Sequence, residues 1–202
     1  MYKKLAILGL GAFVLSACSG DGGGSGGATA TKFIFYTAAK TNGNLAGLPA
    51  GVGGALEKAD AFCEADSNKP NSSTYKAMIT TGSRRACTSA NCSVGGATEN
   101  TQWIMTPNTN YKRADGTIIG TTNSAGIIVG DLTEDLGGTN AVDFAWTGLT
   151  SGWETDSNNC VDWISTGGDD GAAGGLADIN DSWFSGYSYD CGQSMSLICV
   201  EQ

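Results

Sequence analysis

Apolar residues between positions 53 and 67 recur at helical spacing. Leu56, Ala59 and Cys63 stand at i, i+3 and i+7, with charged side chains at most positions between them. This spacing places the three residues on one face of an amphipathic helix. We therefore predict a helix over Gly53–Ser67, with Cys63 on its inner face, where a buried cysteine can meet a core strand.

Most of the remaining chain consists of short apolar runs separated by Gly, Asn and Asp. Such runs, rich in β-branched and aromatic residues, are typical of strands. The last run is expected to be buried and to close the domain against its beginning. Together the patterns predict an α+β domain with one main N-terminal helix and much irregular chain. The predicted strands are Lys32–Thr37, Tyr75–Thr80, Gln102–Met105, Ile118–Ile119, Ile127–Val129, Phe144–Leu149 and Leu197–Val200.

The first thirty residues follow a different pattern. A basic start, Met1–Lys4, precedes the apolar stretch Leu5–Leu15, which is too short to span a bilayer and is typical of a secretion signal. The sequence Leu15-Ser16-Ala17-Cys18 resembles the bacterial lipobox, in which the cysteine is acylated and becomes the first residue of the mature protein. The alternative is an ordinary signal peptide in which Cys18 is incidental.

Glycine dominates the segment from Ser19 to Ala30, and such a composition is typical of a flexible tether. We therefore predict a lipoprotein signal peptide over residues 1–17, a lipidated Cys18 with its tether over residues 18–30, and a folded domain over residues 31–202. The lipid anchor would be the chain's contact with the membrane.

Composition narrows the possible functions. The sequence has no histidine and a formal charge of −9, so it lacks the commonest general base and the clustered cations that nucleic-acid binding needs. Arg84 and Arg85 are expected to form a salt-bridged surface pair. Adjacent acids such as Asp169 and Asp170 could in principle hydrolyse glycosides, but in a glycine-rich loop they more often stay solvated. We expect neither an enzyme nor a nucleic-acid-binding protein.

Six cysteines follow Cys18, an even number in a chain that is expected to be exported. Disulfides are therefore favoured over a zinc site, for which the chain offers no Cys-x2-Cys pair and no histidine. Cys87 and Cys92 lie close enough in one loop to bridge each other. The spacings alone leave the pairing open.

The arrangement of these cysteines resembles the C-type lectin-like fold. A cysteine on an early helix is followed by Trp146-Thr147-Gly148-Leu149, a mid-chain Cys160 and a Cys-x7-Cys pair that ends in a strand. This resemblance implies mostly short antiparallel strands and three disulfides, Cys63–Cys199, Cys160–Cys191 and Cys87–Cys92. The tryptophans are expected to pack in the core or at its rim, at positions Trp103, Trp146, Trp153, Trp163 and Trp183.

A narrower resemblance extends over residues 31–202. The lipobox and tether, Ala59–Cys63, Tyr75–Ile79, Arg113–Asn123 and Leu197–Gln202 resemble, as a set, the endostatin-like outer-membrane lipoproteins of leptospires, whose domain is of the DUF1554 type. The resemblance implies a lipid-anchored protein of the outer membrane, exposed at the cell surface. It also implies a role as an adhesin or as a recruiter of host extracellular-matrix proteins, complement regulators or plasminogen.

Two further functions are weighed beside that one. The first is a calcium-dependent carbohydrate-binding module, although the Glu-Pro-Asn or Gln-Pro-Asp loop and the Trp-Asn-Asp strand of calcium-dependent lectins do not occur here. Calcium needs six to eight oxygen ligands, and the interpretation as a solvated acidic loop without a cofactor is favoured. The second is an envelope structural lipoprotein without a host ligand. The weak calcium candidates are Asp162, Asp169, Asp170, Asp178 and Asp181.

Overall fold

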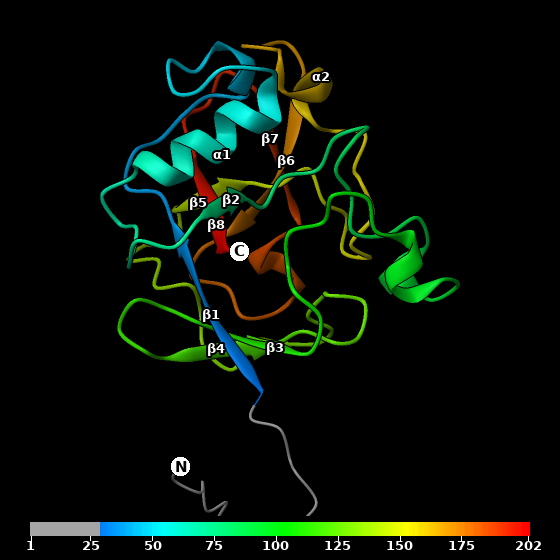
Figure 1. The fold of residues 1–202 in the computed structure, drawn as a ribbon. Coiled ribbons are helices and arrows are strands. Elements are labelled where there is room, and N and C mark those ends of the chain that lie inside the picture. Colours follow the sequence, from blue (N-terminus) through cyan, green and yellow to red (C-terminus); the bar gives the residue numbers. More distant parts are fainter. Residues whose placement is uncertain (1–28) are drawn as a thin grey trace, which may run out of the picture.

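The computed structural model describes residues 29–202 (Figure 1). The predicted signal peptide, Cys18 and almost all of the tether lie outside the described residues. Short strands and few helices make up the described part, which is an α+β arrangement with long irregular connections. No helix within residues 29–202 is both long enough and apolar enough to cross a membrane.

Eight strands form one sheet in the order β4-β3-β1-β8-β5-β6-β7, with β2 also paired to β8. Five of the strand pairs are antiparallel, while β1–β3 and β5–β8 are parallel. The strands are β1 (Ala30–Tyr36), β2 (Tyr75–Ala77), β3 (Thr109–Lys112), β4 (Ile118–Thr121), β5 (Phe144–Trp146), β6 (Asp170–Gly175), β7 (Tyr187–Asp190) and β8 (Ser196–Glu201). The helices are α1 (Ala55–Ala65), α2 (Cys160–Trp163) and four 3-10 turns at Leu45–Gly47, Ala90–Cys92, Gly96–Glu99 and Asp181–Trp183.

Strand β8 joins the parts of the sheet, because it pairs with three other strands. Ile198–Val200 pair with β1, residues 199–201 pair with β2, and residues 196–197 pair with β5. The prediction that the last strand closes the domain against its beginning is thus confirmed. Figure 1 shows β8 crossing the middle of the molecule beside β1 and β2.

The alternation of side chains along β8 divides the interior into two clusters. Leu197 and Cys199 point to one face, which α1 covers, and Ile198 and Val200 point to the other, which irregular chain covers. Successive side chains of a strand must face opposite ways, so one strand can serve two cores. We call the first the helix-side cluster, with Phe35, Leu56, Ala59, Cys63, Tyr75, Trp146, Trp163, Leu197 and Cys199 among its members. The second is the loop-side cluster, with Ile34, Met78, Tyr111, Ile119, Trp153, Trp183, Phe184, Ile198 and Val200 among its members.

Helix α1 lies within the predicted range and buries the predicted face, Leu56, Ala59 and Cys63. It begins after Gly54, where the carboxylate of Glu57 accepts a hydrogen bond from the Gly54 N–H at 2.9 Å. It ends at Asp66, whose carboxylate instead accepts hydrogen bonds from the N–H groups of Ala38 and Ala39. An acidic side chain at each end of α1 thus accepts from backbone N–H groups, at the first end from Gly54 beside the helix and at the second from the chain that follows β1.

Two predicted strands are wrong. Gln102–Met105 and Ile127–Val129 are irregular, although Ile104, Met105, Ile127 and Ile128 are buried in the loop-side cluster. Side chains replace strand pairing there: Trp103 Nε1 donates to the Gly126 carbonyl at 2.8 Å, and Trp153 Nε1 donates to the Ile128 carbonyl at 3.0 Å. The predicted strands at 75–80 and 144–149 are present but shorter, as β2 and β5.

Strand β6 has no large side chain, and no strand was predicted there. Its sequence, Asp-Gly-Ala-Ala-Gly-Gly, lacks the β-branched residues typical of strands. Close packing explains the glycines, since a Cβ added at Gly174 would lie 2.1 Å from the Trp183 carbonyl oxygen. The chain at 183–184 can approach β6 closely only because Gly174 has no side chain.

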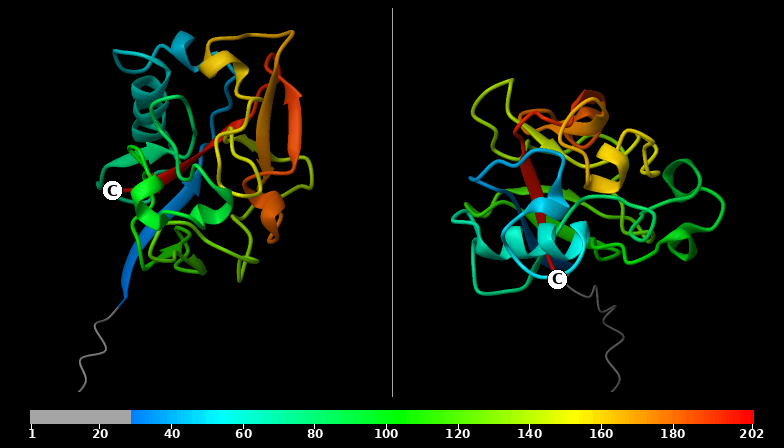
Figure 2. Two further views of the ribbon diagram at one scale, coloured as in Figure 1. Left: turned by 90° about the vertical axis from the view of Figure 1, so that its right-hand side faces the viewer. Right: turned by 90° about the horizontal axis from the view of Figure 1, so that it is seen from above.

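Helix α2 is a single turn with an uncommon backbone. Its four residues, Cys160 to Trp163, all have positive φ, between 52° and 64°. None of the four is glycine, and a left-handed conformation costs an L-residue about 1–2 kcal/mol. The turn lies with α1 at the end of the molecule opposite the start of β1 (Figures 1 and 2).

Candidate binding surfaces

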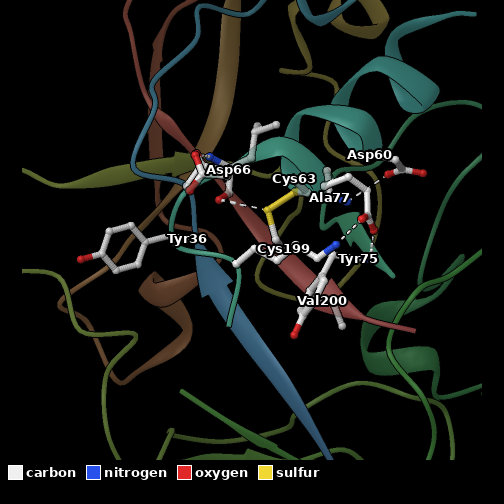
Figure 3. The surroundings of a disulfide bond; sticks show 12 residues. Tyr36, Asp60, Cys63, Asp66, Tyr75, Ala77, Cys199 and Val200 are labelled. Atoms are coloured by element: carbon white, nitrogen blue, oxygen red, sulfur yellow. Dashed lines mark hydrogen bonds and ion pairs between the residues drawn. A yellow bond between two sulfur atoms is a disulfide. The ribbon is translucent and has the colours of Figure 1, made fainter. Parts of the chain in front are cut away.

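Three disulfides are present in the described chain. They join Cys63 to Cys199, Cys160 to Cys191 and Cys87 to Cys92, which are the pairs that the resemblance implies. Figure 3 shows the first, which links the inner face of α1 to β8. The two long-range bonds both lie in the helix-side cluster. Cys18 lies outside the described residues, so its predicted lipidation stays a prediction.

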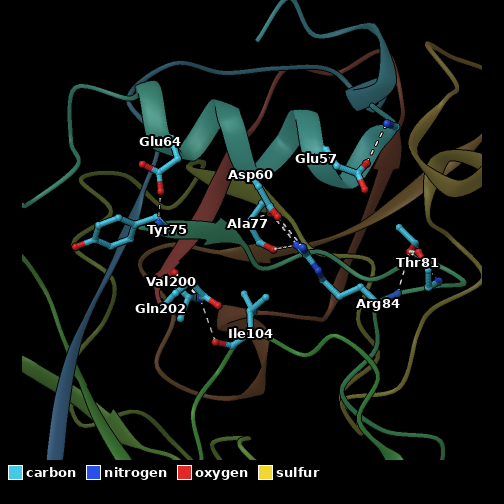
Figure 4. A network of polar contacts seen from close by, with 12 residues as sticks. Glu57, Asp60, Glu64, Tyr75, Ala77, Thr81, Arg84, Ile104, Val200 and Gln202 are labelled. Carbon is cyan, nitrogen blue, oxygen red and sulfur yellow. Dashed lines mark hydrogen bonds and ion pairs between the residues drawn. The ribbon is translucent and has the colours of Figure 1, made fainter. Parts of the chain in front are cut away.

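Arg84 is buried, which corrects the prediction of a surface pair. Its side chain is 3% exposed, and its two terminal nitrogens donate to the carboxylate of Asp60 at 2.8 and 2.7 Å (Figure 4). Asp60 lies on α1 beside the end of β2 and also accepts from the Ala77 N–H at 2.9 Å. Arg85 is half-buried and donates to the Glu99 carbonyl. Both arginines therefore stabilise the fold rather than offering a cationic surface.

The weak calcium candidates are each held in their own surroundings. Asp162 accepts from the Gly82 N–H, Asp169 accepts from the Ser165 hydroxyl at 2.7 Å, and Asp178 accepts from the Tyr187 hydroxyl at 3.0 Å. The hydrogen bond that the Tyr187 hydroxyl donates to Asp178 is the main cause of the raised pKa of that tyrosine. Asp170 begins β6 and Asp181 begins a 3-10 turn. Among residues 29–202, no three Asp, Glu, Cys or His side chains are grouped so as to hold a metal ion.

A stapled loop, residues 86–100, extends from the body of the molecule (Figure 2). The Cys87–Cys92 bond bridges its first half, and the Glu99 carboxylate lies inside it. Glu99 accepts from the backbone N–H groups of Thr88, Ser89 and Gly95, each at 2.7 Å, and from the Thr88 and Ser89 hydroxyls. These bonds, that of Gly95 foremost, hold the pKa of Glu99 well below its usual range.

A groove of about 440 Å³ runs beside the second half of β1. Strand β3 pairs with β1 only as far as Phe33, so no strand lies along that edge from Ile34 to Tyr36. The buried apolar residues Ile34 and Phe35 of β1 and Leu136 line the groove, and polar residues surround them. The lining residues are Ile34, Phe35, Tyr36, Asn68, Arg113, Ala114, Asp115, Leu136 and Gly137.

Hydrogen bonds fix the polar rim of this groove. The Tyr36 hydroxyl donates to the Gly137 carbonyl at 2.9 Å, and Asn68 Nδ2 donates to the Tyr36 carbonyl at 3.0 Å. Arg113 bridges two carboxylates, with nitrogen–oxygen distances of 2.9 Å to Asp115 and 3.1 Å to Asp135. Its charge is therefore already paired within the protein.

The electrostatics of the rim are acidic. Hydrogen bonds from the Thr117 N–H and from Arg113 lower the pKa of Asp115 to about 2, so this carboxylate is ionised at neutral pH. Burial raises the pKa of Tyr36, and the negative charges of Asp143 and Asp135 raise it further. The carboxylates of Asp115 and Asp135 thus flank the single charge of Arg113. This excess of negative charge favours a cationic or neutral ligand.

This groove was not predicted from the amino-acid sequence. Its lining comes from four segments that lie far apart along the chain, and only the tertiary fold brings them together. Nothing in the sequence of residues 113–115 indicates that they face β1. Four of the five predicted core tryptophans are fully buried, and Trp103 packs at the edge of the loop-side cluster.

Comparison with protein families gives one match, to the family described as protein of unknown function (DUF1554), over residues 39–181. No curated protein matches the sequence. The family match supports the DUF1554 part of the resemblance and does not extend to a leptospiral origin or to a lectin-like name. The matched region includes α1 and four of the six disulfide cysteines, all except Cys191 and Cys199, and it contains the groove residues other than the three of β1. Since it covers more than half of the chain, this protein belongs to the DUF1554 family.

Proposed function

We propose that this protein is a lipid-anchored binding protein of the bacterial outer membrane, which captures host proteins at the cell surface without catalysing a reaction. The observation that carries the proposal is the groove beside β1, with its apolar floor and acidic rim. Its volume is in the range of ordinary ligand sites. The predicted signal peptide, Cys18 and tether motivate the membrane anchor.

The groove suits an extended segment of a partner protein. Along Ile34–Tyr36 one edge of β1 has no neighbouring strand, and such an edge can pair with an added peptide strand. Apolar side chains of that segment would contact Leu136 and Phe35. A lysine or arginine would be attracted to Asp115 and Asp135, which outnumber Arg113. Matrix proteins, complement regulators and plasminogen are the partner classes to test.

The C-type lectin-like fold is part of the same proposal. It is supported by a C-terminal strand that pairs with β1 and by the disulfide between α1 and that strand. Sugar binding through calcium is not part of it, because the acidic candidates are used singly in their own loops.

The test is surface plasmon resonance with the full, oxidised chain in non-ionic detergent over a panel of matrix, complement-regulator and plasminogen samples. Ala114 is exposed and lines the groove, so Ala114→Trp fills the site without disturbing the core. We expect saturable binding to a panel member that Ala114→Trp weakens at least about tenfold, which corresponds to about 1.4 kcal/mol. Ala97→Trp is the matched control, because Ala97 is equally exposed but lies in the stapled loop outside the groove.

Each arm of this experiment decides between functions. Binding that needs calcium and disappears with chelator would favour the carbohydrate-type module instead. An absence of saturable binding across the panel would favour an envelope structural lipoprotein. Protease treatment of intact cells separates a surface-exposed protein, which is cleaved, from one that faces the periplasm and is protected.

A further inference from the structure

The left-handed turn of α2 has its two ends buried and its middle exposed. Cys160 is bonded to Cys191, and Trp163 packs edge-on against Trp146 while its Nε1 donates to the Thr80 carbonyl at 2.7 Å. Between these anchors, Val161 is 52% exposed. The fold thus holds both ends firmly enough to impose an unfavourable backbone on the residues between them.

Val161 is poorly suited to this position on intramolecular grounds. Its φ of 54° is uncommon for any L-residue and is a marked outlier for a β-branched one. It belongs to neither buried cluster, so packing does not offset the strain. Asparagine or glycine would adopt the same backbone more easily. Strained backbone conformations of this kind cluster at functional sites, and the exposed Val161 side chain is accessible to a partner.

The surroundings of Val161 extend this exposed apolar surface and give it a charge. Ile164, at the end of the turn, is 58% exposed. On the other side lies a hollow of about 380 Å³, between Asp162, the first turn of α1 and residues 81–83. The ionisable side chains that line it are Glu57 and Asp162, both acidic. The cation nearest to Glu57 in the chain, Lys58, is directed to the carbonyls of Ala46 and Leu48 instead.

From this geometry we propose that residues 160–164 and the adjoining hollow form a second docking surface, for a protein segment that carries both apolar and basic side chains. Apolar side chains of the partner pack on Val161 and Ile164, and a lysine or arginine enters the hollow between Asp162 and Glu57. The surface lies at the end of the molecule opposite the start of β1 (Figure 1). It is separate from the groove, and its acidity matches the acidic balance of the chain.

If the chain is anchored as proposed, the docking surface faces away from the membrane. The tether precedes β1, so the end that carries α1 and α2 is the end farthest from the anchored side (Figure 2). This orientation of the domain rests on the proposed anchor, whereas the docking surface itself does not. A rigid turn at that end meets a partner before the groove does.

The test uses fluorescence anisotropy with a dye-labelled peptide of alternating lysine and leucine and, for comparison, one of alternating glutamate and leucine. All measurements are made on the full, oxidised chain that carries Ala114→Trp. This substitution fills the groove, so peptide binding cannot take place there, and the result does not depend on whether the groove binds a ligand. We expect saturable binding of the lysine peptide alone. Asp162→Asn should weaken it about threefold and Val161→Asn about fivefold.

Thermal unfolding separates docking from structure. Val161→Asn should raise Tm by about 2–4 °C, because asparagine tolerates positive φ, while it weakens binding. Ile164→Asn is the matched control: it removes an equally exposed apolar side chain at negative φ, so binding should weaken with Tm unchanged. Equal binding of both peptides, unchanged affinity in Val161→Asn and Asp162→Asn, or a lower Tm in Val161→Asn would overturn the proposal.

Discussion

The helix-side and loop-side clusters share the same central strands but are held together differently. The helix-side cluster lies under α1 and contains both long-range disulfides, Cys63–Cys199 and Cys160–Cys191. The loop-side cluster lies under irregular chain, and its disulfide joins residues only five apart. Its coherence comes from stacked aromatic rings and from side chains that bond to the backbone.

Trp153 is the centre of the loop-side cluster. Its ring stacks on Phe184 with the ring centroids 4.0 Å apart, and it meets Trp183 and Trp103 edge-on. Its indole N–H satisfies a backbone carbonyl that no strand pairs. Irregular chain can thus form a core when large side chains supply both the packing and the missing backbone partners.

Removal of the Cys63–Cys199 bond should have the largest effect. In the chain-entropy treatment, a bond across 136 residues stabilises the fold by about 5 kcal/mol, and one across 5 residues by about 2 kcal/mol. The double variant Cys63→Ala, Cys199→Ala should therefore lose more unfolding free energy in urea than Cys87→Ala, Cys92→Ala. Equal losses would mean that covalent closure does not distinguish the two clusters.

Trp153→Ala should cost about 4 kcal/mol of unfolding free energy, because it leaves a large cavity in the loop-side cluster. Trp153→Phe keeps a ring against Phe184 but removes the bond to the Ile128 carbonyl and part of the indole volume, so its cost should be smaller, about 2 kcal/mol. Urea unfolding of both variants measures the two costs. If both substitutions cost the same, the ring that phenylalanine retains would contribute nothing to stability.

The smallest expected effect concerns Glu99 in the stapled loop. The pKa of Glu99 is lowered by folding, so its contribution to stability is fully present above the unfolded pKa, about 4.5, and is lost as pH falls toward the folded pKa. Glu99→Gln should therefore lower Tm at pH 7, and its difference from the unmodified chain should shrink below about pH 4.5.

Thermal unfolding from pH 7 to pH 2.5 checks this expectation. Comparison with Glu99→Gln at each pH cancels the titration of the other carboxylates, such as Asp115. A difference in Tm that stays constant across that range would show that the effect comes from replacing one acceptor oxygen by an NH2 group and that the charge has no part.

Periodicity predicted the helix-side cluster well and the loop-side cluster poorly. The spacing of Leu56, Ala59 and Cys63 determines which face of α1 is buried, and the apolar run at 197–200 is the buried strand that was predicted. The same kind of run at 102–105 and at 127–129 is buried without being a strand. Its backbone partners are distant side chains such as Trp153, which no local pattern reveals.

The two candidate surfaces could not be predicted from the sequence, for related reasons. The groove unites four segments through the fold, and the left-handed turn depends on anchors at Cys160 and Trp163 that hold it from both ends. The segment Cys160–Trp163 contains no glycine or asparagine that would indicate positive φ. The disulfide pairs, by contrast, were implied by the resemblance to the C-type lectin-like fold. The order of the cysteines along the chain resembles the order in that fold, and the same order implies the same pairs.

The central position of β8 also determines when the fold can form. A ribosome releases the chain from its first residue onward, so β1, β2 and β5 all emerge before the strand that pairs with each of them. The sheet cannot be completed until residues 196–201 have appeared, and α1 waits equally long for the cysteine that it bonds. Long-range pairing of this kind slows folding. The domain can therefore close only once its last strand has emerged, and until then β1, β2 and β5 lack the strand with which each of them pairs.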